Sequence, residues 1–199
     1  MKSVGLSILM LLSMTVPALA LIGIGGFTYD VSLPAGETKD YTDNVSFRGL
    51  GLEARWFRSD NTAIGFTWHW STFHEQGGGT WPVEDGHVTG HNFRRIRCSP
   101  VLAVLYFEMG DIEYGARGPL YYAGIGAGVF WIEKRMEIGT GAYQTTRWHF
   151  GFAPEAGFMY GVGFNTHVQF GVKFNYALKS GDNTGHSYLT AIIGVSWAR

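Results

Sequence analysis

Charged and histidine side chains recur at alternate positions in segments of this chain that are otherwise apolar or rich in glycine. Residues two apart in an extended strand share one face, so this spacing gathers the polar groups on one side of a sheet. Inside a narrow barrel such charges must be paired and hydrogen-bonded. The candidates for a polar network in the lumen are Glu53, Arg55, His69, Arg95, Arg97, Arg147, His149, Glu155, His167 and Lys173.

This candidate network has two interpretations. It is either an ionic plug that keeps the barrel rigid, or a path for protons or ions that also offers a ligand site. An eight-stranded barrel is barely wide enough for its own inward side chains, which favours the plug. Glycines on the same face leave room for water and keep the second interpretation open.

A second polar segment, residues 74–92, contains the side-chain types that bind metals, namely His74, Glu75, Glu84, Asp85, His87 and His91. The two last histidines have a spacing seen in zinc sites on helices. The glycine run at residues 77–79 and the proline that follows argue against a helix. We therefore predict an external loop here, with no metal and no cofactor, of the kind through which barrels meet partners.

The elements that must position these groups are clearest in residues 147–177. Two arms joined by the turn-forming sequence GVGFN alternate small or polar residues with Trp148, Phe150, Phe152, Ala156, Phe158 and Tyr160, then with Val168, Phe170, Val172, Phe174 and Tyr176. Each arm is longer than the usual soluble strand, and its apolar face is aromatic at the ends. This pattern is typical of strands that cross a membrane in a barrel, with an apolar exterior and a polar interior.

The same alternation predicts eight strands, at about residues 21–31, 45–57, 62–73, 93–108, 119–133, 147–160, 167–176 and 187–197. Polar connections over residues 32–44, 74–92, 134–146 and 178–186 are predicted as external loops. Because transmembrane barrels have short periplasmic turns and long external loops, both termini are predicted to lie in the periplasm. Pro100 removes a ladder donor and predicts a bulge or a slip of parity in the fourth strand.

Composition and targeting signals agree with this fold. Lys2, an apolar run over residues 4–16 and an Ala-x-Ala site predict a signal peptide over residues 1–20, followed by one barrel domain over residues 21–199. The run is short for a membrane anchor helix, the alternative reading, which needs about 20 residues. The formal net charge is −1 and no basic run is present, so no nucleic-acid partner is expected.

The chain resembles the small bacterial outer-membrane β-barrel superfamily, the OmpA, OmpX and opacity-protein type. The resemblance spans residues 21–199, and its most specific parts are PLYYAGIGAGVFW, FAPEAGFMYGV and the closing strand YLTAIIGVSW. It implies a closed eight-stranded antiparallel up-and-down barrel, and a closing strand that the outer-membrane assembly machinery recognises. Here Trp197 is followed by two further residues, so the aromatic of that assembly signal is not terminal.

Some members of this superfamily modify lipids, and the pair His69 and Ser71 is the place where this chain could carry such chemistry. Outer-membrane lipid A deacylases use a histidine and a serine on neighbouring strand positions with an acidic partner. This chain lacks the flanking residues of that motif, and His69 is predicted to face the lumen. We therefore expect no catalysis.

The sequence thus predicts an integral protein of the bacterial outer membrane with a structural or surface-interaction role. Its expected partners are outer-membrane lipid, lipopolysaccharide and the assembly machinery; the sequence does not identify a surface partner. A narrow, porin-like channel for ions or small hydrophobic molecules is the alternative, and a lipid-modifying enzyme is less favoured. A soluble barrel with its apolar face inward would reverse the facing of every strand.

Overall fold

The computed structural model describes residues 23–83, 86–110, 118–138, 141–181 and 184–198. It contains eight strands and one short helix. These elements are β1 (Gly23–Ala35), α2 (Gly36–Tyr41), β2 (Gly49–Ser59), β3 (Thr62–Val83), β4 (Gly86–Met109), β5 (Pro119–Ile138), β6 (Gly141–Gly161), β7 (Thr166–Ala177) and β8 (His186–Ala198). The predicted signal peptide, residues 1–20, lies outside the described residues.

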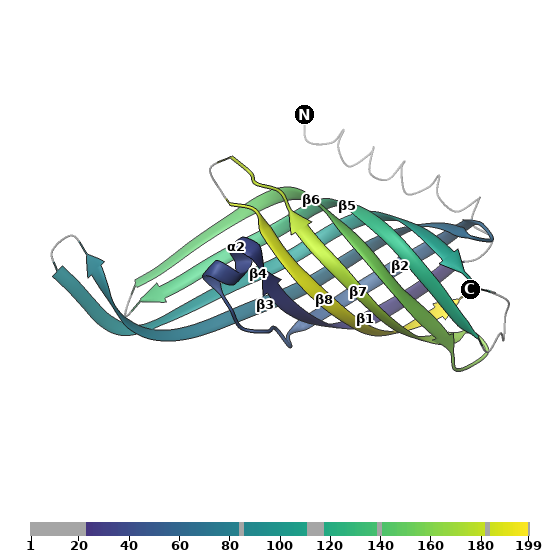
Figure 1. The fold of residues 1–199 in the computed structure, drawn as a ribbon, viewed down its shortest axis with the longest axis horizontal. Helices are drawn as coiled ribbons and strands as arrows, with labels where there is room; N and C mark the ends of the chain where they lie inside the picture. Colours follow the sequence, from purple (N-terminus) through teal and green to yellow (C-terminus); the bar gives the residue numbers. More distant parts are fainter. Residues whose placement is uncertain (1–22, 84–85, 111–117, 139–140, 182–183, 199) are drawn as a thin grey trace, which may run out of the picture.

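The strands form one closed barrel in which each strand pairs with its neighbours in the sequence (Figure 1). All pairs are antiparallel, and β1 closes the ring on β8, with Ile24 opposite Ala198. Closure gives every strand two partners and leaves no open sheet edge around the barrel body, as a membrane-spanning sheet requires. The predicted fold class and the number of strands are confirmed.

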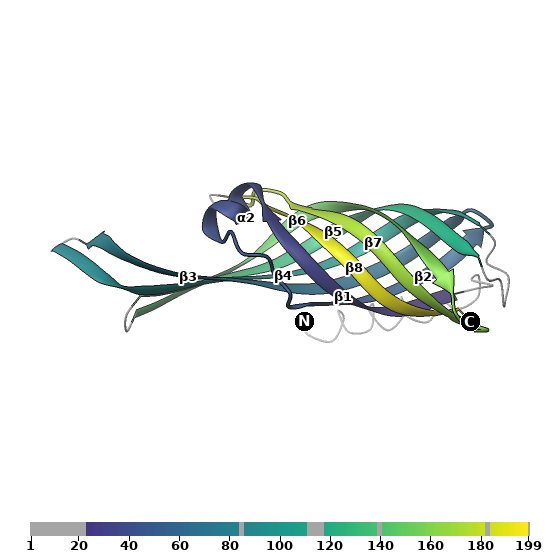
Figure 2. The same cartoon turned by 60° about the horizontal axis from the view of Figure 1, so that its bottom comes forward.

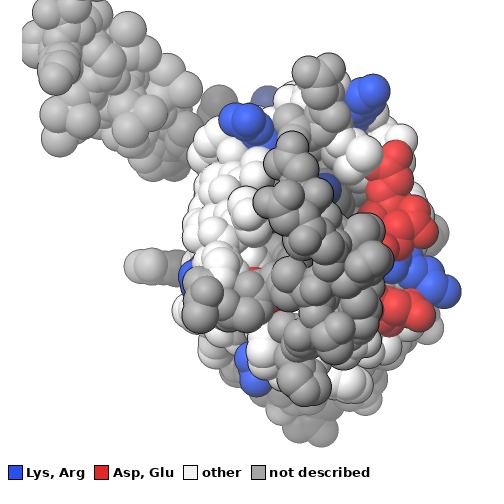
Figure 3. Space-filling model, turned by 90° about the vertical axis from the view of Figure 1, so that its left-hand side faces the viewer, with Lys and Arg blue, Asp and Glu red and all other residues white. Residues whose placement is uncertain are grey.

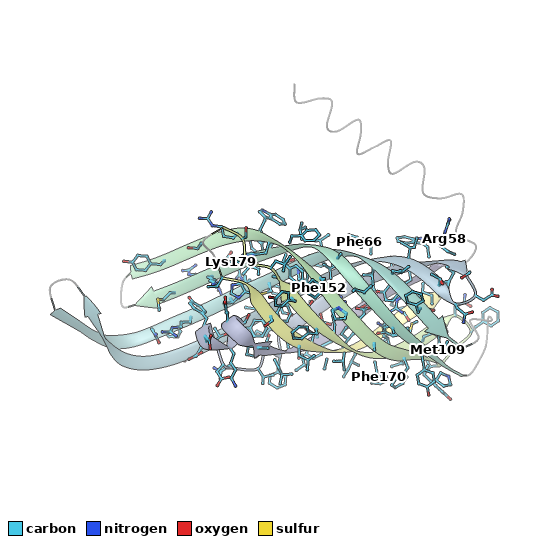
Figure 4. The ribbon with its side chains drawn as sticks, turned by 45° about the horizontal axis from the view of Figure 1, so that its top comes forward. Arg58, Phe66, Met109, Phe152, Phe170 and Lys179 are labelled. Carbon is cyan, nitrogen blue, oxygen red and sulfur yellow. The ribbon has the colours of Figure 1, made fainter. Side chains whose placement is uncertain are left out.

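The two faces of the barrel differ as the alternation predicts. Outward side chains are large and apolar, and many are exposed, including Phe27, Leu50, Phe66, Ile125, Phe150, Phe170, Ile193 and Trp197. Figure 4 shows side chains standing away from the ribbon all around the barrel, with Phe66, Phe152 and Phe170 labelled. The inward side chains are buried and mostly small, polar or charged. An exposed apolar patch of this extent is the surface that a lipid bilayer covers.

At one end four strands continue past the barrel as a protruding sheet (Figures 1 and 2). The pairing of β3 with β4 runs out to Val83 and Gly86, and the pairing of β5 with β6 runs out to Ile138 and Gly141. β6 meets β7 only from Gly151 onward. The predictions of external loops over residues 74–92 and 134–146 were therefore wrong: both segments are mainly strand, because ladder hydrogen bonds to a neighbour outweigh their polar, glycine-rich composition.

The fourth strand also departs from its prediction. β4 keeps one register against β3 on both sides of Pro100, and a single register against β5 along its whole length. The missing proline donor is absorbed without an extra residue, so Pro100 causes neither a bulge nor a slip of parity. Arg95, Arg97 and Ser99 consequently continue the outward row of Val101, and not the lumenal row.

A short helix lies across the mouth of the barrel where a loop is predicted over residues 32–44. α2 begins at Gly36, whose φ of +49° is a left-handed conformation that glycine adopts without strain. The Thr38 hydroxyl lies 3.1 Å from His186 Nδ1 and accepts a hydrogen bond of 3.1 Å from the Ser187 amide. Tyr41 donates its hydroxyl to the carbonyl of Arg135. α2 thereby joins β8 to β5 over the lumen.

None of the described helices has the length and apolar character to cross a membrane.

Candidate functional site in the barrel lumen

The charged groups of the lumen come from strands that bring them to one level of the barrel. Glu155 on β6 stands directly opposite Lys173 on β7, and His69 on β3 stands opposite Gly51 on β2. Gly51 is needed at this place, because a Cβ there would lie 2.4 Å from His69 Nδ1. The small residue on one strand therefore makes space for the imidazole on the next.

A chain of close polar contacts runs from β1 through β3 and β7 to β6. The Thr28 hydroxyl donates to Asp30 Oδ1 over 2.9 Å, and Asp30 Oδ2 lies 2.7 Å from His69 Nδ1. Lys173 Nζ lies 2.7 Å from His69 Nε2 and 2.7 Å from Glu155 Oε2. An ammonium group only donates, so His69 Nε2 accepts from Lys173 and the imidazole proton on Nδ1 points to Asp30.

Arg55 forms a second cluster beside this chain. Its guanidinium lies 4.0 Å from the ring centroids of both Tyr106 and Tyr122, which hold it between two aromatic faces. It pairs with Glu53 at 3.0 Å and with Glu108 at 3.3 Å. The two aromatic contacts and two carboxylates compensate for taking this cation out of water.

Glu53 connects the two clusters. Its Oε2 accepts from Arg55 and, over 2.8 Å, from the Gln169 amide, which also donates to the Tyr122 hydroxyl over 3.1 Å. Its Oε1 lies 3.6 Å from His69 Nε2 and 3.8 Å from Lys173 Nζ. Removing Glu53 would therefore take a partner from four cationic or polar groups at once.

Packing around these clusters fills the lumen. The largest side chains with almost no exposure include Arg55, Tyr106, Tyr188, Phe73, Phe130, Lys173, Met159 and Gln169. Gly65 and Gly124 face Tyr106 so closely that a Cβ on either would lie under 3 Å from its ring. The space beside these two glycines is filled by the Tyr106 ring, which favours the plug interpretation.

The charges in this lumen do not cancel. Asp30, Glu53, Glu108 and Glu155 face two permanent cations, Arg55 and Lys173, together with His69. Glu108 Oε2 and Glu155 Oε1 have no hydrogen-bond partner among the described residues. The formal charge of these buried groups is negative, so this level of the lumen is better suited to a proton or a cation than to an anion.

The structure brings together five of the ten predicted network residues, Glu53, Arg55, His69, Glu155 and Lys173. His149 faces inward at the mouth, where Nδ1 lies 2.9 Å from the Leu178 carbonyl and its ring meets His186. His167 is half-buried near the other end, and Arg147 is exposed on the protruding sheet.

The prediction that Arg95 and Arg97 face the lumen was wrong. Both lie on the outward row of β4, where they approach Glu133 of β5 at 3.6 Å and 3.5 Å. The error follows from the bulge expected at Pro100, which would have moved them to the other face.

Sequence reasoning missed several lumenal residues, above all Asp30, Glu108, Tyr106 and Tyr122. It also missed that Gln169 donates to both Glu53 and Tyr122. Thr28, Asp30 and Ser32 do show a polar row with period 2, which would have identified the inward face of β1. Tyr106 and Glu108 would have fallen on the inward row if strict alternation had been carried through Pro100.

Ser71 does not pair with His69. Its hydroxyl lies 3.0 Å from the Ser32 hydroxyl, and both nitrogens of His69 are already engaged by Asp30 and Lys173. His69 therefore has no free nitrogen with which to activate a nucleophile.

The other candidate constellation gains no support from the described residues, which hold no group of three side chains suited to a metal ion. Of its members, Glu84 and Asp85 lie outside the described residues, and nothing is described of the side chains of His87 and His91.

Fold and lumen together define a class of protein: a closed up-and-down barrel with an apolar aromatic exterior and a filled polar interior, the architecture of small outer-membrane barrels. Two of the solved structures that match illustrate this fold. Neisserial surface protein A matches with a TM-score of 0.55 and 10% identity, over 89% of this chain and 95% of that one. Ail, the attachment invasion locus protein of Yersinia pestis, matches with a TM-score of 0.51 and 12% identity, over 89% of this chain and 96% of that one.

The predicted resemblance to the small outer-membrane barrels is confirmed at the level of the fold. No family model matches this sequence, and no curated protein matches it.

Proposed function

We propose that this protein is an integral barrel of the bacterial outer membrane with a structural or surface-interaction role and without catalysis. The observation that carries the proposal is the combination of a lumen filled by charge clusters and aromatic side chains with a sheet that extends beyond the barrel. A filled lumen supports a scaffold, and the protruding sheet supplies a presented surface. Lipid and lipopolysaccharide would surround the barrel, and the closing strand β8 would engage the assembly machinery.

Planar-bilayer conductance tests the role of the lumen. A plugged barrel should give no steady current, whereas a narrow channel should conduct. The surplus of lumenal carboxylate is the specific observation that favours a channel, and any current through it should select cations. Steady cation-selective conductance from protein that also shifts on a gel between boiled and unboiled samples would replace the structural role with the channel.

Topology follows from the same proposal. With both termini in the periplasm, the protruding sheet and Lys179 lie outside the cell, and the turn at Asp60 lies inside. Lys179→Cys should react with a membrane-impermeant maleimide on intact cells, and Asp60→Cys only after permeabilisation. Both positions are exposed and the native Cys98 is buried, so it adds no background. The reverse labelling pattern would invert the orientation.

A further inference from the structure

A group of arginines gathers on the outward face where the protruding sheet leaves the barrel. We call it the outward arginine cluster, and it consists of Arg48, Arg95, Arg97 and Arg135 with His74, Glu133 and Glu137. Its members are cross-strand neighbours: Arg97 stands between Thr72 and Glu133, and Arg95 stands between His74 and Arg135. The amide of Thr72 donates to the Arg48 carbonyl, which brings β2 to the edge of the cluster.

The cluster lies just beyond an aromatic belt. Trp70, Ser99 and Trp131 lie on the same outward rows, each two positions closer to the barrel than Thr72, Arg97 and Glu133. Trp131 pairs across the sheet with Trp148. Tryptophans of this kind mark the interface of a membrane, and two residues of strand rise by about 6 to 7 Å. The outward arginine cluster is therefore at the height of lipid headgroups, on the side of the sheet that faces the bilayer.

The positive charge of the cluster is not balanced. Arg95 and Arg97 approach one and the same oxygen, Glu133 Oε1, and neither comes closer than 3.5 Å. Arg135 has its own partner in Glu137 at 2.6 Å. Arg48 forms no ion pair within the described part of the chain and lies 3.5 Å from His74 Nε2. Four guanidinium groups thus face two carboxylates.

The pKa of His74 is sensitive to the positive charge of these arginines. Partial burial, then the charge of Arg48, and in smaller measure Arg95 and Arg97, hold the pKa of His74 below its ordinary value. The lowered pKa favours the neutral form of His74. The Nε groups of Arg95 and Arg97 are also buried without a hydrogen-bond acceptor among the described residues, although their side chains are 27% and 34% exposed.

The surface beside these donors is open to a ligand. A hollow on the protruding sheet is lined by His74, Phe93, Arg94, Arg95 and Arg135, together with the carboxylates Glu75 and Glu137. Figure 3 looks onto this end of the molecule and shows basic side chains at several places around the rim, with the acidic ones gathered on one side. The exposed ends of these arginines could bind phosphate, because the guanidinium fork binds phosphate oxygens in pairs.

We propose that the outward arginine cluster binds the phosphate group of a phosphorylated lipid of the outer leaflet. Arg95 and Arg97 would donate to the phosphate oxygens, Arg48 would add its charge from β2, and the acyl chains would lie along the Trp70 and Trp131 side of the belt. A lipid fits better than a soluble phosphate because the donors face the bilayer at headgroup height. The inference rests on the proposed function, since it requires the barrel to stand in a membrane.

The test counts lipid retained by the purified, folded protein in detergent micelles. The probes are diphosphoryl lipid A, monophosphoryl lipid A and phosphatidylcholine, counted per protein by native mass spectrometry. The wild type should retain the diphosphoryl lipid over phosphatidylcholine. Arg95→Gln/Arg97→Gln should retain less by at least roughly ten-fold, because the loss of even one charge-assisted hydrogen bond costs about that factor.

The matched control removes the same charge from the opposite face of the same sheet. Lys134 and Arg147 lie on the inward rows of β5 and β6, in register with Ile96 and Ile132. Lys134→Gln/Arg147→Gln should retain the diphosphoryl lipid as the wild type does. Equal losses in the two double variants, or no loss in either, would overturn the proposal, as would displacement of the lipid by inorganic phosphate at comparable concentration.

A gel shift between boiled and unboiled samples accompanies each measurement. If the wild type shows the shift and retains no phosphorylated lipid, this inference fails and the barrel stands; if it shows no shift, the proposed function fails. If Arg95→Gln/Arg97→Gln does not fold, Arg48→Gln decides the matter, because it leaves Glu133 and its partners untouched. Retention by Arg48→Gln equal to that of the wild type would then count against the cluster.

Discussion

The lumen and the outward face of this barrel use the same side chains with different consequences. Inside, Lys173 and Glu155 lie 2.7 Å apart and both side chains are 1% exposed. Outside, Arg97 and Glu133 lie 3.5 Å apart and the arginine is 34% exposed. A buried charge that loses its partner has no water to replace it, whereas an exposed one does. The inner pairs therefore hold the barrel together, and the outer ones remain available to a ligand.

The largest effect is expected when one charge in the lumen loses its partner. Lys173→Met should destabilise the folded barrel by about 3–5 kcal/mol, because Glu155 loses its buried cation and Glu53 loses a neighbour. Urea midpoints after refolding into lipid vesicles measure the change. Lys173→Met/Glu155→Gln should recover part of the loss, since it removes the stranded charge; a single variant as stable as the wild type would show that the lumen is wet.

A charge placed on the lipid-facing side probes the other half of the comparison. Phe170 is outward and Gln169, its neighbour, is buried in the lumen. Phe170→Arg should cost about 2–4 kcal/mol near the midplane and hardly respond to salt, because lipid holds no mobile ions. Gln169→Arg should instead suffer from crowding near Lys173, with an effect that salt reduces wherever water reaches it. A Phe170→Arg variant that folds like its parent would contradict the assignment of Phe170 to the lipid-facing side.

The two tyrosines that enclose Arg55 separate stacking from hydrogen bonding. The Tyr122 hydroxyl accepts from Gln169, whereas the Tyr106 hydroxyl has no hydrogen-bond partner among the described residues. Tyr122→Phe should cost about 0.5–1.5 kcal/mol, a typical net hydrogen bond, and Tyr106→Phe should be close to neutral. Each variant keeps its ring over the guanidinium and is the control for the other. Equal denaturation midpoints for the two variants would contradict this assignment.

The smallest effect is expected at the outer rim. Glu133→Gln removes the buried carboxylate that Arg95 and Arg97 share, but the two arginines left behind are 27% and 34% exposed and can be solvated. The change in stability should therefore be at most about 1 kcal/mol, and less at high salt. Urea midpoints at two salt concentrations measure this. A cost as large as that of Lys173→Met would mean that the rim is as dry as the lumen, and the distinction between the two regions would be lost.

Sequence reasoning reached the fold because period 2 in hydrophobicity is a local property. The alternation of Val168 to Tyr176 with His167 to Asn175 identifies the face of β7 without knowledge of any other strand. The same local signal gave eight strands and the inward position of Glu53, Arg55, His69, Glu155 and Lys173. The prediction failed in β4, where a bulge expected at Pro100 was taken to interrupt the alternation of inward and outward residues.

No local signal in the sequence predicts which lumenal side chains contact one another. Asp30 meets His69 across 39 residues, and Gln169 meets Glu53 across 116. Alternation says that these side chains share the lumen, but closure and register decide which of them share a level. The protruding sheet is a similar case, because residues 74–92 have the composition of a loop and become strand only when a neighbour supplies the ladder.

The sequence by itself therefore determined the faces, the strand number and the membrane-crossing character, since each depends on residue type and a spacing of two. Tertiary structure alone decided how far the hairpins extend, which charges are paired and which arginines point outward. The physical reason is that hydrophobic alternation is encoded residue by residue, whereas ladder pairing and the burial of a charge depend on the strand alongside.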